Sequence, residues 1–374
     1  MTNDTVNGIS GRRLQLRARV RLAAVTGFLL VTWAAAPVHA QSSGPERWAF
    51  EAMASGNANA TSVDDPFLIF DATGTVRVHD GFDLIFQPYA HRMPGGDWDA
   101  EMYQLQIRYV PPTRLALRVD AGILTSPVGQ NTLELLPDKN PTISAPSFYF
   151  APLPRFDVRY DGVQLISGGY PVGAIVSSSG TKWDARAGVT DQTPTRRRNA
   201  LAADRPSAAP QIIAGGGYVP FAGLRLGTSV AHGKYRNASG ATPAAPAVGA
   251  ADATMVTFEG EYAIGYSRFT GEWIRDRFET TTTPAVARGF SVMFTRTLAP
   301  RWFVASRVNR VNAPAYVSPT LSVRKTSSSG EATLGYRLSP DVTVRGGYQA
   351  SRSYNATDWS HAFVMQAVWA QRWN

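Results

Sequence analysis

The alternation of apolar and polar residues between Met102 and Leu124 constrains the fold more than any other stretch of this chain. The apolar set is Tyr103, Leu105, Ile107, Tyr109, Leu115, Leu117, Val119, Ala121 and Ile123, and the residues between them are mostly polar. Pro111 and Pro112 interrupt the pattern and predict a turn. Because alternate side chains of a strand lie on opposite faces, the stretch predicts a hairpin with one apolar face and one polar face.

Repetition of this pattern along the chain predicts an all-β, transmembrane, antiparallel β-barrel of about sixteen strands, with the apolar face toward lipid and the polar face toward water. The expected strands are Trp48–Ala54, Phe67–Val78, Phe82–His91, Met102–Val110, Arg114–Leu124, Val158–Ser167, Lys182–Asp191, Gln211–Pro220, Leu224–Tyr235, Met255–Ala263, Tyr266–Phe278, Arg288–Leu298, Arg301–Val311, Glu331–Ser339, Val342–Tyr354 and His361–Trp373. The connection Gly168–Gly180 could hold a further strand around Ala174–Ser177.

The connections between these strands sort by length, which supports a membrane barrel over a soluble sheet. The turns after the second, fourth, eighth, tenth, twelfth and fourteenth strands have two to four residues, and the connections after odd-numbered strands are mostly long. Short turns on the periplasmic side and long loops outside are the rule of outer-membrane barrels, with both termini inside when the strand number is even.

The first forty residues have the three parts of a cleaved secretory signal peptide. Five arginines precede the apolar run Leu22–Ala36, and Val38-His39-Ala40 resembles a cleavage site. The pair Arg12-Arg13 is a weak sign of twin-arginine export, but the general secretory route suits a barrel better. We expect residues 1–40 to be removed and 41–374 to form the barrel. The formal charge then falls from +9 to +5. The chain has no cysteine, which excludes disulfides and thiolate chemistry, and no other stretch is apolar enough for a transmembrane helix.

Each strand's phase divides its side chains between lipid and lumen. The expected lipid-facing set is Leu105, Leu117, Trp183, Phe258, Trp273, Phe290, Phe294, Trp302, Leu334, Tyr348, Phe363 and Trp369. The expected pore-lining residues are Arg77, Arg108, Arg118, Asp120, Lys139, Asp184, Arg186, Arg225, Glu259, Glu261, Arg268, Glu272, Arg307, Glu331, Arg337 and Arg345. Charges of both signs predict a water-filled interior, because a dry core would need every one of them paired. The excess of arginine, 33 against four lysines, either gives the pore a positive field that favours anions or is neutralised by carboxylates on neighbouring strands.

The stretch from Leu117 to Gly129, with Thr125-Ser126-Pro127-Val128-Gly129 at its end, resembles the strand-then-loop segment of the phosphate-selective porins O and P and their broad relatives. Asp161-Gly162-Val163-Gln164-Leu165 looks like the returning strand of that family, and Gly271-Glu272-Trp273 like a later one. The resemblance implies a sixteen-stranded porin, a homotrimer, and Thr125–Pro154 as a constriction loop folded into the channel. Phosphate-selective members concentrate Lys and Arg there, whereas this loop offers only Lys139 and Arg155.

Passive diffusion of small hydrophilic solutes or ions through the outer membrane of a Gram-negative bacterium is the function that these features favour. The expected partners are outer-membrane lipid and lipopolysaccharide, which Arg196-Arg197-Arg198 could contact, with no nucleic acid, cofactor or metal. Two alternatives stay open: a non-conducting structural or adhesive barrel, and a lipid-acting enzyme that would use His91, His232 or His361 with Ser229 or Ser360. The triplet Gly215-Gly216-Gly217 is expected to leave room on a crowded barrel wall.

Overall fold

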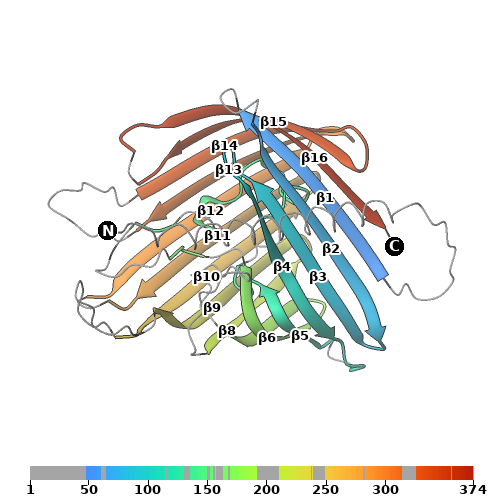
Figure 1. Cartoon of the computed structure of the whole chain (residues 1–374), viewed down its shortest axis with the longest axis vertical. Coiled ribbons are helices and arrows are strands. Elements are labelled where there is room, and N and C mark those ends of the chain that lie inside the picture. The colour runs from blue at the N-terminus through green and yellow to red at the C-terminus, as the bar shows by residue number, and fades with distance from the viewer. Residues whose placement is uncertain are drawn as a thin grey trace, which may run out of the picture.

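Sixteen antiparallel strands form a closed barrel in the part of the chain that the structure describes (Figure 1). The computed structural model describes residues 48–59, 65–113, 116–129, 135–149, 152–154, 156, 163–166, 169–191, 210–236, 238, 249–280, 283–313, 326–354 and 356–373. The strands are β1 (Trp48–Asn59), β2 (Phe67–His79), β3 (Phe82–Arg92), β4 (Trp98–Tyr109), β5 (Arg118–Thr125), β6 (Gly169–Ser179), β7 (Trp183–Thr190), β8 (Gln211–Phe221), β9 (Leu224–Arg236), β10 (Ala251–Ile264), β11 (Ser267–Phe278), β12 (Ala285–Thr297), β13 (Trp302–Asn312), β14 (Thr326–Arg337), β15 (Val342–Arg352) and β16 (Ser360–Trp373).

Every strand pairs with its neighbours in the sequence, and β1 pairs with β16 from Phe50–Trp373 to Asn59–Val364, which closes the sheet. Closure leaves no edge strand with unpaired backbone groups, the condition for a sheet to stand in lipid. None of the helical turns among the described residues is long and apolar enough to cross a membrane.

The two faces of the wall follow the predicted alternation. Along β12, Phe290 and Val292 are exposed on the outer face, whereas Ser291 and Met293 are buried inside. Eight of the twelve residues expected to face lipid are exposed, and Leu117, Trp273, Phe294 and Trp369 are partly buried. The outer wall is therefore apolar over its middle, as a lipid-facing surface requires.

The lengths of the connections confirm the predicted alternation for most of the barrel. Tight turns join β2 to β3, β6 to β7, β8 to β9, β10 to β11, β12 to β13 and β14 to β15, and both chain ends of the barrel lie at this same short-turn end. One pair departs from the rule, because residues 110–117 between β4 and β5 are longer than residues 93–97 between β3 and β4. We call the opposite end of the barrel the long-loop end.

The predicted strand Val158–Ser167 is wrong where the structure describes it, and its other residues, 158–162 and 167, lie outside the described part of the chain. The described residues Val163–Ile166 of this stretch are not in a strand, and they form only an isolated bridge between Gln164 and Pro152. The sixth strand of the barrel is instead Gly169–Ser179, which pairs with β5 and β7 and contains the region that the sequence left open. The count of sixteen is correct because one strand was replaced by another.

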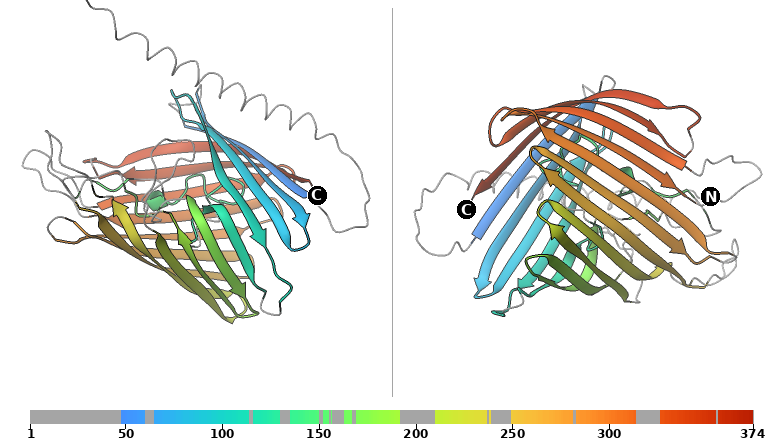
Figure 2. Two further views of the ribbon diagram at one scale, coloured as in Figure 1. Left: turned by 60° about the horizontal axis from the view of Figure 1, so that its bottom comes forward. Right: turned by 180° about the vertical axis from the view of Figure 1, so that it is seen from behind.

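The chain between β5 and β6 enters the barrel, and we call its described part, within residues 126–166, the inserted segment. A short 3-10 helix, Ser147–Tyr149, lies inside the ring of strands (Figure 2, left). Phe148, Tyr149 and Leu165 are almost completely buried. These aromatic and aliphatic side chains therefore pack inside the barrel.

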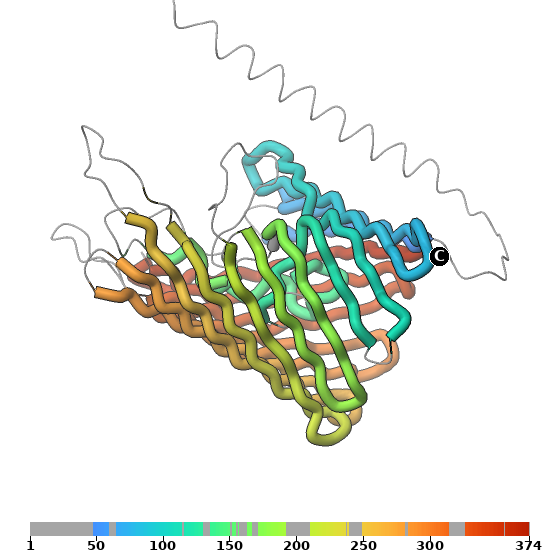
Figure 3. The backbone as a smooth tube through the Cα atoms, turned by 90° about the horizontal axis from the view of Figure 1, so that it is seen from below, coloured from blue at the N-terminus to red at the C-terminus, as the bar shows by residue number. Residues whose placement is uncertain are grey.

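Two apolar clusters hold the inserted segment against opposite parts of the wall. The larger one joins the segment to inward residues of β8–β13; its members include Phe148, Leu165, Ile213, Met255 and Phe278. In the smaller one, Leu136 packs near Met53 of β1, Ile69 of β2 and Val368 of β16. Figure 3 shows the green segment within the tube of strands. The lumen is thus part dry core and part polar surface, rather than polar throughout.

Candidate functional site: the barrel interior

Paired charges line the interior near the short-turn end. The Arg77 guanidinium lies 3.0 Å from an Asp83 carboxylate oxygen. Asp120 receives two guanidinium groups, from Arg108 at 2.8 Å and from Arg118 at 2.9 Å. The Arg77 and Arg118 side chains are nearly half exposed, at 45% and 47%. These groups are accessible to solvent and would meet a solute at this mouth.

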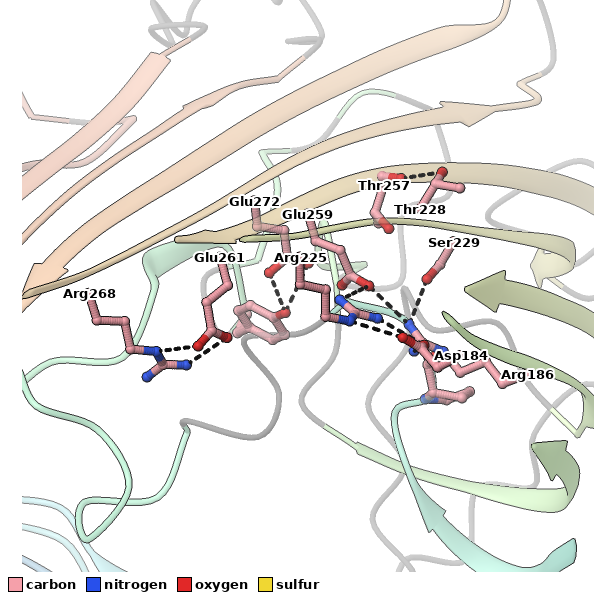
Figure 4. Close-up of polar contacts among 12 residues, drawn as sticks. Asp184, Arg186, Arg225, Thr228, Ser229, Thr257, Glu259, Glu261, Arg268 and Glu272 are labelled. Atoms are coloured by element: carbon pink, nitrogen blue, oxygen red, sulfur yellow. Dashed lines mark hydrogen bonds and ion pairs between the residues drawn. The ribbon is translucent and has the colours of Figure 1, made fainter. Parts of the chain in front are cut away.

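A second network runs along the inner faces of β7 to β11 (Figure 4). Arg225 donates two hydrogen bonds to the Asp184 carboxylate, at 2.9 and 3.0 Å, and lies 3.3 Å from Glu259. Arg268 makes a two-pronged contact with Glu261 at 2.8 and 3.1 Å. Every arginine of this network has a carboxylate partner. Of the two alternatives that the sequence left open, this is the one in which carboxylates on neighbouring strands neutralise the arginines.

Gly217 leaves the space that this network occupies. A Cβ atom at Gly217 would lie 2.4 Å from the Arg225 guanidinium and 2.7 Å from an Asp184 oxygen. The expectation that the glycine triplet leaves room on a crowded wall is confirmed at this position.

Deeper in the barrel, the inserted segment is bound by three charged residues of the wall. Glu331 of β14 accepts hydrogen bonds from the main-chain N–H groups of Ile143, at 2.5 Å, and Ser144, at 3.0 Å. Arg307 of β13 donates to the Asn140 side chain at 2.9 Å and to the Ser144 carbonyl. Arg345 of β15 reaches the carbonyl oxygens of Pro137, at 2.8 Å, and Thr142, at 3.3 Å. These three side chains are buried, so they face the lumen but contact the segment in place of water.

The beginning of the inserted segment is fixed on the other side of the barrel. Tyr149 donates its hydroxyl to Glu272 of β11, and Gly129 lies against that contact with a φ of +82°. A Cβ at Gly129 would stand 2.2 Å from a Glu272 oxygen. Arg186 of β7 donates to the Pro127 carbonyl at 2.7 Å and to Ser229 at 2.7 Å. The Pro-Val-Gly turn therefore has a structural reason for its glycine.

Two ionisable groups of the segment are shifted by burial. Desolvation raises the pKa of Asp138 above its ordinary value, the nearby Lys139 ammonium opposes that shift, and Glu51 of β1 adds to it. Desolvation, together with the Glu272 carboxylate, raises the pKa of Tyr149 well above its ordinary value. Lys139 is half exposed and lies 3.9 Å from Asp138.

The structure separates the predicted pore-lining residues into two groups. Accessible ones lie toward the short-turn end: Arg77, Arg108, Arg118, Asp184, Arg225, Glu261, Arg268 and Arg337. Asp120, Glu259, Glu272, Arg307, Glu331 and Arg345 are buried against the segment or within the wall. Arg186 is partly exposed and contacts the segment, and Lys139 lies on the segment itself. Sequence reasoning did not single out Asn140 and Ser144, two of the segment's own contacts. Their only signal was a cluster of prolines and aromatics in a long connection.

Two histidine–serine pairs considered for a lipid-acting enzyme point to opposite sides of the wall. Ser229 contacts Arg186 inside, whereas His232 is exposed on the outer face beside Thr254. Ser360 and His361 are adjacent in β16, so their side chains also diverge. The structure does bring together His91, Asp99 and Glu101, with ligand atoms within 4.8 Å of one another, a donor set able to hold a divalent cation. The Arg196-Arg197-Arg198 triplet and Arg155 lie outside the described residues.

The barrel is similar to several solved outer-membrane proteins. The anion-selective porin from Comamonas acidovorans shares 12% identity over 87% of this chain and 98% of its own, with a TM-score of 0.53. Pseudomonas putida OprB shares 12% identity over 87% of this chain and 93% of its own, with a TM-score of 0.54. OmpT, an outer membrane protein of Vibrio cholerae, shares 10% identity over 88% of this chain and 99% of its own, with a TM-score of 0.54.

No family model and no curated protein sequence matches the chain. The resemblance to the phosphate-selective porins O and P is therefore not confirmed and stays a prediction. At these identities the structural likeness concerns the fold alone, and in fold this chain is a closed sixteen-stranded antiparallel barrel like those of the solved outer-membrane proteins.

Proposed function

We propose that this chain is an outer-membrane porin that allows passive diffusion of small hydrophilic solutes or ions. The observation that supports the proposal best is a sixteen-stranded barrel whose outer wall is apolar and whose inner wall carries solvent-accessible charges at one mouth. A barrel of this size is wide enough for an aqueous channel. Export through a cleaved signal peptide at residues 1–40 and assembly as a homotrimer are parts of the same proposal.

The inserted segment is proposed to narrow the channel. It contacts β1, β2 and β16 on one side and β8–β13 on the other, and its polar contacts add β7, β14 and β15. Tyr89 of β3 packs against the smaller cluster, whereas the inner faces of β4 and β5 around Arg108 and Arg118 lie outside both clusters. We therefore place the solute route beside that wall, past Arg108, Arg118 and Asp120.

Anion preference is proposed only in a weak form. Each accessible arginine of the β4–β5 and β7–β11 networks lies beside a carboxylate, so its field is largely cancelled within a few ångströms. Arginine content alone would suggest a stronger preference. The exposed Arg118 is the group whose charge a passing ion would feel most directly.

Single-channel recording of the purified mature protein in a planar bilayer tests the proposal. Stepwise conductance is expected. Under a salt gradient the reversal potential should be small, with the sign that indicates a slight preference for chloride over the cation. Arg118→Gln should move it toward cations. Arg296→Gln, which alters an exposed arginine on the outer face of β12, should leave it unchanged. Equal shifts in both variants would contradict the proposed route.

A second candidate, a non-conducting structural barrel, is favoured by one observation: the inserted segment touches both sides of the lumen. Heat-modifiable mobility in gel electrophoresis reports whether the barrel is folded. A fully folded sample that shows no conductance steps would reject the porin proposal and support this alternative. Native mass spectrometry of the same sample tests the proposed trimer.

A further inference from the structure

Four arginines face outward from the barrel near its long-loop end. Arg275 and Arg277 of β11, Arg288 of β12 and Arg310 of β13 are all exposed, while the residues between them, such as Asp276 and Ala287, are buried on the inner face. The three strands are neighbours in the sheet and run side by side across the right panel of Figure 2. We call these four residues the outer arginine patch.

The pairing of the strands places like charges against each other in this patch. Arg275 stands directly opposite Arg288, and Arg310 lies opposite Phe290, one outward position along from Arg288. Like charges directly opposite each other destabilise a sheet. Within the described part of the chain, no carboxylate lies within ion-pair distance of the four guanidinium groups.

The acidic groups at this level of the outer face do not neutralise the patch. Asp252 of β10 lies 3.9 Å from the Lys234 ammonium, and Glu279 follows the end of β11 as an exposed residue. Among the described residues this face therefore keeps a net positive charge, and an external anion would relieve the repulsion between Arg275 and Arg288.

The depth of the patch agrees with the boundary between lipid tails and headgroups. On the outer face of β12, Arg288 and Arg296 enclose the apolar residues Phe290, Val292 and Phe294. Eight residues of strand span roughly 27 Å, which at a tilt of about 40° is roughly 21 Å across the membrane, close to the apolar band of such barrels. The two arginines thus lie at the two opposite interfaces.

A hollow in the outer wall lies on β12–β16, nearer to the middle of the strands than the patch is. Its volume is about 540 Å³, its floor includes Ser306, Ala332 and Gly346, and its sides include Phe294, Leu334 and Phe363. Ser306 and Arg310 lie on the same strand, two outward positions apart. Small residues on the floor and aromatic or aliphatic sides make a surface that fits a hydrocarbon chain.

We propose that the outer arginine patch and the hollow together bind one phosphorylated glycolipid of the outer leaflet, the lipid A part of lipopolysaccharide. The patch holds the phosphate groups through charge-assisted hydrogen bonds from guanidinium donors, and the hollow holds an acyl chain. The inference takes the membrane location from the proposed function, but it does not depend on conduction.

Titration of the purified full barrel with bisphosphorylated lipid A, followed by native mass spectrometry, tests this site. The double variant Arg275→Gln/Arg288→Gln should weaken binding by about tenfold or more, because each lost contact is a hydrogen bond to a charged group. Arg296→Gln, at the opposite interface of the same strand, is the matched control and should bind as the native protein does. Enzymatically dephosphorylated lipid A should bind the native protein as weakly as bisphosphorylated lipid A binds the double variant.

The hollow is tested separately by filling it. A Cβ at Gly346 would meet no heavy atom within 4 Å, so the side chain of Gly346→Leu can begin there and extend into the proposed space of the acyl chain. It should weaken lipid A binding, whereas Gly271→Leu on the outer face of β11 should not. If the double variant does not assemble, Arg310→Gln and the comparison of the two lipids decide the question.

Three results would overturn the proposal. One is equal affinity for bisphosphorylated and dephosphorylated lipid A, and another is an equal loss of binding in Arg296→Gln. The third is a change in subunit number without a change in lipid affinity, which would make the patch a contact between copies. Conductance is recorded in the same preparations: lipid binding without conductance would reject the porin proposal alone, and conductance without lipid binding would reject only this site.

Discussion

Replacing Glu331 by alanine should release the inserted segment from the wall of the barrel. The Glu331 carboxylate accepts the main-chain N–H groups of Ile143 and Ser144 at 2.5 and 3.0 Å, and also hydrogen bonds from Thr333 and Gln349. A buried donor left without its acceptor costs about 1–3 kcal/mol. Two such donors therefore destabilise the docked segment by roughly 2–6 kcal/mol in Glu331→Ala.

Hydrogen exchange measured by mass spectrometry on peptides that cover residues 140–149 reports this loss directly. A cost of roughly 2–6 kcal/mol corresponds to exchange of these amides that is about 30-fold to about 20,000-fold faster, since about 1.4 kcal/mol is a factor of ten. Glu261→Ala is the control, because Glu261 pairs with the partly exposed Arg268 near the mouth, a contact worth at most about 1 kcal/mol. Unchanged exchange in Glu331→Ala, or equal acceleration in both variants, would refute the reasoning.

Three further predictions concern the loop, its titration and the outer wall. Gly129→Val should lower the thermal midpoint of the folded barrel, because a φ of +82° costs a branched residue at least ~1–2 kcal/mol and its Cβ would displace Glu272; a midpoint like that of Gly346→Ala would contradict this. Since burial raises the pKa of Asp138, the folded state holds that proton more tightly, and stability should fall as pH rises from the ordinary aspartate range through the raised value; Asp138→Asn should remove this part of the slope in melting curves taken across pH. Leu334→Arg should destabilise folding into bilayers by about 2–4 kcal/mol if the site is near the middle of the lipid band, which equilibrium refolding measures.

Most of the barrel could be predicted from the sequence because strand phase and connection length are local properties. The error at Val158–Ser167 shows the limit of that reasoning. Alternation indicates an extended segment with two unlike faces, but it does not indicate which backbone that segment pairs with. In this segment the apolar side chains of Val163 and Leu165 are buried inside the lumen instead of facing lipid. The sequence of β6 gives a weaker strand signal, because its inner face carries glycine and serine instead of charged residues. Gly173 and Ser177 lie on the inner face of the strand, and Ala174 and Val176 lie on its outer face.

The candidate site was predictable in orientation but not in contact. Phase alone places Arg307 and Glu331 on the inner face, and they do lie there. Whether such a group meets water or protein depends on a segment more than 160 residues earlier in the chain, a separation that no periodicity encodes. Asn140 and Ser144 are ordinary loop residues in sequence, and only the docked segment shows them to be the partners of Arg307.

The arginine excess is therefore a poor measure of the field inside the channel. Arg307 and Arg345 use their donors on the inserted segment, and the guanidinium of Arg225 lies between two carboxylates. Arg275 and Arg288 do not face the channel at all. A charge contributes to ion selectivity only where it is accessible, and a neighbouring opposite charge weakens its contribution. The most accessible arginines, Arg77 and Arg118 at the short-turn mouth, each have an aspartate within 3.0 Å. For this chain the location of each arginine, rather than their number, would determine the ion preference of the proposed pore and the ligand of the proposed site on the outer wall.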